Sequence, residues 1–246
     1  MNSLIRNLCA GLVASAALMA SGSLGLAADY IEPVPEVVVA PPAVGGWYLR
    51  GDVGYSAAKF RGASYTLPGG GGCGDPCGDG DPQIHGGKLK GSFLIGGGVG
   101  YQVTDYFRTD LTLDYMTRAK FTSDRDESQM SALSLLANAY VDLGNFGGVT
   151  PYVGAGIGGT RVKWDDLVDT TNGGVLPGDA NWRFTYALMA GASVDLTQNL
   201  KLDAGYRYRH INGGKMFDGA YGLGDGYDKG MNVHDVRVGL RYMFGG

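Results

Sequence analysis

The ten residues "KLDAGYRYRH" at 201–210 alternate between apolar and charged side chains. In an extended strand successive side chains point to opposite faces, so this segment would have one apolar face and one ionic face. The apolar face carries Leu202, Ala204, Tyr206 and Tyr208, and the ionic face carries Lys201, Asp203, Arg207 and Arg209. The apolar face must be kept from water, either by a protein core or by a membrane, and the rest of the chain indicates which.

Seven further segments alternate in the same way, and the connections between them are alternately short and long. "TDY" (104–106), "GNFGGV" (144–149) and "TQN" (197–199) are tight turns, whereas about 59–91, 118–131, 163–181 and 212–232 are long polar loops. This pattern predicts an all-β fold, an eight-stranded antiparallel up-and-down transmembrane β-barrel with short periplasmic turns and long extracellular loops. The predicted strands are 47–57, 92–103, 107–117, 132–143, 151–162, 182–196, 200–210 and 233–244.

The ionic faces of these strands hold nearly equal numbers of basic and acidic residues. Inside a barrel each ion needs a counter-ion because an unpaired buried charge is costly, whereas charges in water need no such balance. A soluble barrel with an apolar interior is the alternative, but aromatic residues near the strand ends are typical of membrane interfaces. We therefore expect lipid outside and, inside, a charge network of Arg50, Asp52, Arg108, Asp110, Asp114, Asp142, Arg183, Asp195, Lys201, Asp203, Arg207, Arg209, Asp235, Arg237 and Arg241.

The N-terminus has the features of a secretory leader. Arg6 precedes the short apolar run "LCAGLVASAALMA", and "GLA" at 25–27 offers small residues for cleavage. Pro33, Pro35, Pro41 and Pro42 follow in a segment that should be extended. We therefore predict a signal peptide at 1–28, a proline-rich periplasmic tether at 29–45 and an outer-membrane barrel at 46–246.

Two cysteines follow the leader, Cys73 and Cys77, both in "GGGGCGDPCGDGDP". In an oxidising compartment this spacing favours a small local disulfide. A metal site that also uses nearby aspartates and His85 is the alternative, but two cysteines without a second pair are a weak zinc signal.

Two histidines lie near the ends of neighbouring predicted strands. His210 ends one strand and His234 begins the next, so a register that pairs them would place them side by side as a weak candidate metal or haem contact. An interfacial histidine pair without a ligand is the plainer interpretation of the same register.

Composition excludes several other classes of function. The net charge of −4 argues against a general nucleic-acid binder. Beyond the N-terminus no apolar run is long enough for a transmembrane helix. With only His85, His210 and His234 available, we find no catalytic constellation and expect neither an enzyme nor a cofactor.

Three segments carry a family resemblance: "GWYLRGDVGYS" (46–56), "TPYVGAGIG" (150–158) and "VRVGLRYMF" (236–244). The chain resembles the small outer-membrane surface antigens of alphaproteobacteria, which are grouped as porin-family proteins with a barrel like that of outer-membrane protein A. The resemblance implies recognition by the barrel-assembly machinery through a terminal aromatic residue. Here Phe244 is followed by Gly245 and Gly246.

Three roles are compatible with such a barrel. The first is structural support and surface display, with the interior plugged by the Arg/Asp network, since side chains can fill an eight-stranded barrel. The second is a narrow channel for ions or small solutes, and the third is a surface receptor for a ligand such as haem or a metal. The expected partners are outer-membrane lipid and lipopolysaccharide, with a loose peptidoglycan contact through residues 29–45. Such a barrel is also compatible with homo-oligomers.

Overall fold

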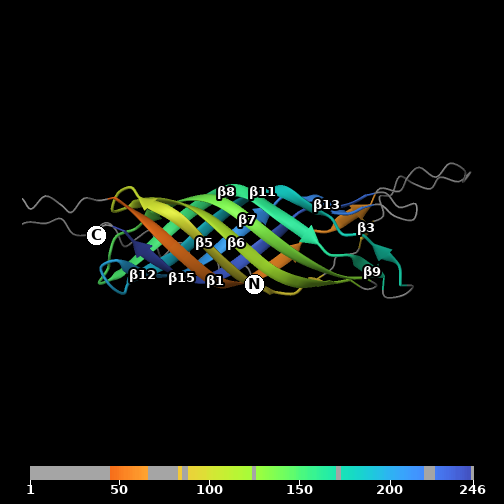
Figure 1. The fold of residues 1–246 in the computed structure, drawn as a ribbon, viewed down its shortest axis with the longest axis horizontal. Helices are drawn as coiled ribbons and strands as arrows, with labels where there is room; N and C mark the ends of the chain where they lie inside the picture. Colours follow the sequence, from red (N-terminus) through yellow and green to blue (C-terminus); the bar gives the residue numbers. More distant parts are fainter. Residues whose placement is uncertain are drawn as a thin grey trace, which may run out of the picture. The chain divides into compact units, whose positions relative to one another are not determined.

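Eight long strands form a closed antiparallel barrel in the computed structural model, which describes residues 45–65, 83–84, 88–123, 126–169, 173–218 and 225–244. Each strand pairs with its neighbours along the chain and the last pairs with the first, which confirms the predicted fold class (Figure 1). The eight are β1 (Gly46–Phe60), β5 (Ser92–Gln102), β6 (Phe107–Thr122), β7 (Asp126–Asp142), β8 (Val149–Trp164), β11 (Ala180–Asp195), β12 (Leu200–Ile211) and β15 (Met231–Met243). No helix in the described part of the chain is long and apolar enough to cross a membrane.

The three tight connections lie together at what we call the turn end of the barrel. They join β5 to β6, β7 to β8 and β11 to β12. In the second of them Gly147 and Gly148 adopt positive φ angles of 64° and 90°, which glycine reaches without steric cost. The side-chain oxygen of Asn145 accepts a hydrogen bond from the amide of Gly148 at 2.7 Å. The glycines of "GNFGGV" therefore allow the reversal.

Short strands extend the barrel at the opposite end, which we call the loop end (Figure 1). β4 (Lys88–Leu89) pairs with β6, and β9 (Leu167–Asp169) pairs with β7 and with β10 (Val175–Leu176). A separate four-stranded sheet is formed by β13 (Gly214–Phe217), β14 (Gly226–Asp228), β2 (Ala63–Tyr65) and β3 (Gln83–Ile84). The long connections thus contain short strands where only loops were predicted.

The strands also run further toward the loop end than predicted. Residues 118–131 were expected to form a loop, but β6 continues to Thr122 and β7 begins at Asp126. The register between these strands shifts between Met116 and Ala119, which is a β-bulge. A bulge resets which side chains face inward, so a strict period-two reading of the sequence ends the strand too early.

The two faces of the barrel wall differ in polarity as the alternation requires. Large apolar side chains point outward and are exposed, with Phe93 71% and Val236 63% accessible. Arginines and aspartates on the same strands point inward and are buried. Toward the loop end the inward side chains become apolar, so the interior has a charged part and an apolar part.

Candidate functional site

The barrel interior holds a neutral set of ions. Among the described residues seven arginines and seven aspartates are buried, so the buried positive and negative charges are equal in number. Arginine suits such a site because its planar guanidinium binds carboxylates through several donors at once. The arginines are Arg50, Arg108, Arg183, Arg207, Arg209, Arg237 and Arg241, and the aspartates are Asp52, Asp110, Asp114, Asp142, Asp203, Asp228 and Asp235.

Asp110 lies at a junction between strands β1, β6 and β7. Its carboxylate accepts hydrogen bonds from Arg50 at 2.9 Å and from the Asn138 side-chain amide at 2.7 Å. The Tyr48 hydroxyl donates to it at 3.2 Å. Arg50 also binds Asp52 through two nitrogens, at 2.9 and 2.8 Å. The network therefore links strands across the interior as well as neighbours within the sheet.

Asp235 is the acceptor at the centre of a second group. Arg207 and Arg209 each donate to it through Nε at 2.8 Å, and Ser56 donates at 2.6 Å. Arg207 continues to Asp114 at 2.6 Å. These side chains come from β1, β6, β12 and β15, so the group connects opposite sides of the barrel. A charge-assisted arrangement of this kind resists rearrangement because every separation leaves a buried ion unpaired.

Arg108 is held near the turn end by rings as well as by charge. Its Nε donates to Asp142 at 3.1 Å. Its guanidinium lies 4.1 Å from the Tyr140 ring centroid and 4.7 Å from that of Tyr152. Both remaining nitrogens of Arg108 are buried without a hydrogen-bond partner. The two aromatic faces supply cation–π attraction where hydrogen bonds are lacking.

Arg183 connects the barrel to the four-stranded sheet at the loop end. It forms an ion pair with Asp228 and donates to the carbonyl oxygen of Lys215 at 2.8 Å. Asp228 also accepts from the amide of Gly230 at 2.8 Å. Burial raises the pKa of Asp228 above its ordinary value, and the nearby Arg183 charge opposes that rise. Asp228 is not among the predicted interior residues because it lies in a predicted loop.

Two of the predicted interior residues lie elsewhere. Asp195 and Lys201 pair with each other at 2.5 Å next to the turn between β11 and β12, where both side chains are partly exposed. Asn145 donates to Asp195 at 2.9 Å from the neighbouring turn. Their assignment to the interior network was wrong because they stand at the strand ends, where the barrel wall no longer encloses the inner face.

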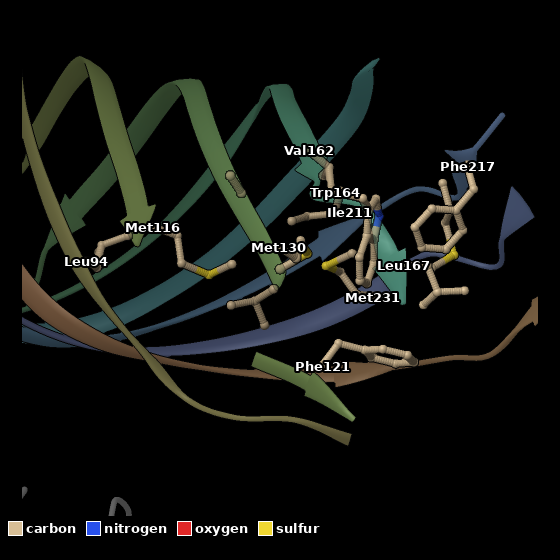
Figure 2. Packing of buried hydrophobic residues seen from close by; sticks show 13 residues of the cluster. Leu94, Met116, Phe121, Met130, Val162, Trp164, Leu167, Ile211, Phe217 and Met231 are labelled. Atoms are coloured by element: carbon tan, nitrogen blue, oxygen red, sulfur yellow. The ribbon is translucent and has the colours of Figure 1, made fainter. Parts of the chain in front are cut away.

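An apolar plug fills the interior toward the loop end (Figure 2). Phe121 and Trp164 pack edge to face with ring centroids 5.6 Å apart, and Phe60 lies 5.4 Å from Phe121 and 5.9 Å from Trp164. This plug was not predicted because 118–131, 163–181 and 212–232 were expected to be polar loops. The buried members are Leu94, Met116, Phe121, Met130, Ala132, Val162, Trp164, Leu167, Ile211, Met216, Phe217, Met231 and Val233.

Little space remains inside the charged part. A cavity among Arg50, Tyr140, Asp203 and Arg207 has a volume of about 10 Å³. A single buried water needs about 10–15 Å³. The interior around this cavity is therefore packed by its own side chains.

The candidate histidine pair is not formed. His234 lies opposite Tyr208 and His210 lies opposite Asn232, so the register differs by two residues from the one that would pair them. His210 is hydrogen-bonded to Asn232 at 2.7 Å, and His234 to the Tyr206 hydroxyl at 2.5 Å. No group of three or more metal-ligating side chains occurs among the described residues. Cys73, Cys77 and His85 lie outside those residues, so the disulfide stays a prediction.

The apolar outer face of the barrel indicates whether water or lipid surrounds it. From Trp47 to Tyr55 on β1 the outward side chains are apolar, aromatic or glycine. At about 3.3 Å per residue and a tilt of about 40°, that span covers about 20 Å along the barrel axis, close to the apolar band of about 25 Å in membrane barrels. A closed barrel that exposes apolar side chains and buries its ions is stable with lipid outside. The protein is an integral outer-membrane β-barrel.

Comparison with known proteins gives the family. The chain belongs to the family described as outer membrane protein beta-barrel domain, whose pattern it matches over residues 14–244. An uncharacterized protein of Brucella suis biovar 1 is 38% identical, with 96% of this chain and 98% of the relative covered. A Rickettsia bellii protein provisionally named an adhesin is 29% identical over 80% of this chain and 87% of its own length.

Solved structures show the same fold. Neisserial surface protein A has a TM-score of 0.52 at 20% identity and covers 81% of this chain and 97% of its own. Outer membrane protein AlkL has a TM-score of 0.50 at 17% identity and covers 92% of this chain and 97% of its own. The family and fold confirm the predicted resemblance and the outer-membrane location.

Proposed function

We propose that this protein is a sealed, non-conducting barrel that displays its loop-end β-structure at the cell surface. The observation that carries the proposal is the double closure of the interior. Six of the buried arginines and six of the buried aspartates fill the charged part nearer the turn end, and the apolar plug fills the part nearer the loop end. An ion that crossed would have to displace the paired charges and then enter an apolar region, and both steps are costly.

The alternative is a narrow channel, and conductance separates the two. Refolded mature protein should give no discrete openings in a planar lipid bilayer. The combined variant Phe60→Ala/Phe121→Ala/Trp164→Ala/Arg207→Ala removes side chains from both layers and should give openings. An outer-face variant, Phe93→Ala, should behave as the wild type. Reproducible openings of the wild-type protein would contradict the sealed barrel.

Adhesion is the display role that we propose. The name of the Rickettsia bellii relative supports it, as does the four-stranded sheet that Arg183 and Asp228 hold at the loop end. An ordered surface loses less conformational entropy on binding than a free loop does. Cells that carry the protein should therefore attach to a host-cell layer more than cells without it.

A matched variant makes this test specific. Arg183→Gln should loosen the loop-end sheet and reduce attachment while the barrel remains assembled. Arg161→Gln, on the outer face of neighbouring β8, removes the same charge without touching the sheet. Equal attachment by cells with and without the protein would reject an adhesive role.

A further inference from the structure

Outward basic side chains gather just beyond the apolar band, at the loop end of the barrel. The band ends near Tyr55 on β1, Phe93 on β5 and Tyr115 on β6, which are exposed aromatic residues. A few residues further along the same part of the wall lie Lys59, Arg61, Lys88, Lys90 and Lys120, all exposed. We call these five residues the basic patch.

The strand register brings the basic patch together. Ser56 of β1 lies opposite Ser92 of β5, and β1 continues beside β4, which places Lys59 next to the segment of Lys88 and Lys90. The amide of Lys90 donates to the carbonyl oxygen of Lys120 at 2.9 Å, so these two lysines are cross-strand neighbours. Like charges on neighbouring strands repel, which an anion bound between them would relieve.

Carboxylates in the described part of the chain compensate only a small part of this charge. Lys120 pairs with Glu127 at 2.9 Å. Within the described ranges, Lys59, Arg61, Lys88 and Lys90 have no ion pair with a carboxylate. By contrast Arg118, on β6 beside Lys120, and Lys163 of β8 share Asp165 at 3.3 and 3.8 Å. Counted over the described residues, the basic patch therefore has positive charge that no carboxylate pairs with, on a surface that adjoins lipid.

The height of the basic patch matches a lipid headgroup. Lys59 lies four residues beyond Tyr55, which is about 10 Å along the barrel axis at about 3.3 Å per residue and a tilt of about 40°. The polar layer outside the hydrocarbon core is several ångströms thick on each side, and aromatic girdles mark its inner edge. Side chains as long as lysine can bend back toward that layer.

We propose that the basic patch binds the phosphate groups of lipopolysaccharide in the outer leaflet. Lysine and arginine close to an anionic membrane surface each add to binding, and charge-assisted hydrogen bonds to phosphate are short and strong. The site consists of Lys59, Arg61, Lys88, Lys90 and Lys120. It would fix the barrel laterally to its lipid and is independent of whether the barrel conducts or adheres.

The test measures binding of two lipids to the full mature chain in detergent micelles. Labelled diphosphoryl lipid A should bind to the wild-type protein at least tenfold more tightly than dephosphorylated lipid A. The variant Lys59→Gln/Lys88→Gln/Lys90→Gln should lose at least about tenfold in affinity for the phosphorylated lipid. Raising the salt concentration should weaken the wild-type binding, because exposed charges are screened.

Two control variants separate charge from folding. Lys163→Gln/Lys201→Gln/Lys215→Gln removes three lysines that already pair with aspartates, and it should bind as the wild type does. Lys59→Arg/Lys88→Arg/Lys90→Arg keeps the charge and should restore binding. Far-ultraviolet circular dichroism of every variant checks that the barrel is folded.

Three outcomes would overturn the proposal. The first is equal binding of the two lipids by the wild type. The second is an unchanged affinity in the folded glutamine variant of the basic patch. The third is tighter binding of a soluble heparin fragment than of diphosphoryl lipid A, which would assign the basic patch to a polyanion outside the cell.

Discussion

Asp235 illustrates how a single residue depends on the closure of the barrel. It accepts hydrogen bonds from Arg207, Arg209 and Ser56, and its side chain is fully buried. Its neighbours in sequence, His234 and Val236, face outward and are exposed. Position 235 therefore requires a carboxylate as the counter-ion of buried guanidinium groups, which neither neighbour contacts.

Replacing Asp235 with alanine should cost about 3–5 kcal/mol of unfolding free energy, because it leaves buried guanidinium groups without their counter-ion. Urea unfolding of the variant in lipid vesicles, followed by tryptophan fluorescence, measures the loss. Asp195→Ala breaks a partly exposed pair and should cost less than about 1 kcal/mol. Equal losses in the two variants would argue against the interior network as a source of stability.

Glycines on the inner face give room to larger side chains. A Cβ added at Gly100 would lie 2.2 Å from the Tyr48 ring and 2.6 Å from the carbonyl oxygen of Thr109, whereas one added at Gly51 would meet nothing within 4 Å. Gly100→Ala should therefore destabilise the barrel by about 1–3 kcal/mol, and Gly51→Ala should not. Thermal unfolding of both variants in detergent tests this, and a stable Gly100→Ala barrel would show that Tyr48 can move aside.

At the scale of the element, the plug depends on strands that continue past the bulge in β6. Ala119 and Phe121 face inward beyond the bulge, where Ala119 lies opposite Met130 of β7 and Phe121 lies opposite Ser128. These residues alternate correctly, but with a phase that differs from that of 107–117. Because β6 and β7 continue past the bulge, they enclose the apolar plug, which shorter strands would leave exposed.

Trp164→Ala should cost about 3–5 kcal/mol of unfolding free energy, since it leaves a cavity beside Phe60 and Phe121. Trp182→Ala removes an outward side chain that is 58% exposed, so it leaves the interior packing intact and should cost less. Chemical unfolding in the same detergent compares the two. A smaller loss at Trp164 than at Trp182 would mean that the plug is loosely packed.

The loop-end sheet should detach from the barrel before the barrel unfolds. Arg183 holds β13 through the carbonyl oxygen of Lys215 and β14 through Asp228. In Arg183→Gln we expect protease cleavage within 212–230 to accelerate several-fold while the barrel strands stay protected, since local opening exposes that segment first. Mass spectrometry of timed digests locates the cuts, with Arg161→Gln as the control. Unchanged cleavage would show that strand pairing alone holds the sheet.

At the scale of the whole molecule, the barrel is inverted relative to a soluble protein. Its outer face carries Trp47, Phe93 and Val236 in exposed positions, and its interior carries the ions. In buffer those apolar side chains would drive association, whereas lipid or detergent covers them.

The mature chain should accordingly fold in detergent micelles or lipid vesicles and not in buffer alone. Far-ultraviolet circular dichroism reports the β-structure, and sedimentation reports the oligomeric state. A folded monomer in plain buffer would contradict the outward orientation of the apolar faces.

The sequence alone specifies the eight barrel strands, their order and the direction of most of their side chains. Alternation with period two and the contrast of short and long connections are local properties, so all eight strands could be predicted. It also determined most of the interior ions, because Arg50 and Asp110 face inward by parity alone.

Which of those residues meet depends on the tertiary structure. The register between β12 and β15 separates His210 from His234, and the bulge in β6 turns Phe121, from a segment that looks like loop, into the apolar plug. Asp228 is buried because β14 lies where its carboxylate pairs with Arg183 of β11. Strand register, bulges and ion pairs of this kind depend on contacts between segments far apart in sequence. A shift of one residue in the register would move every side chain of a strand to the opposite face, so local alternation cannot specify them.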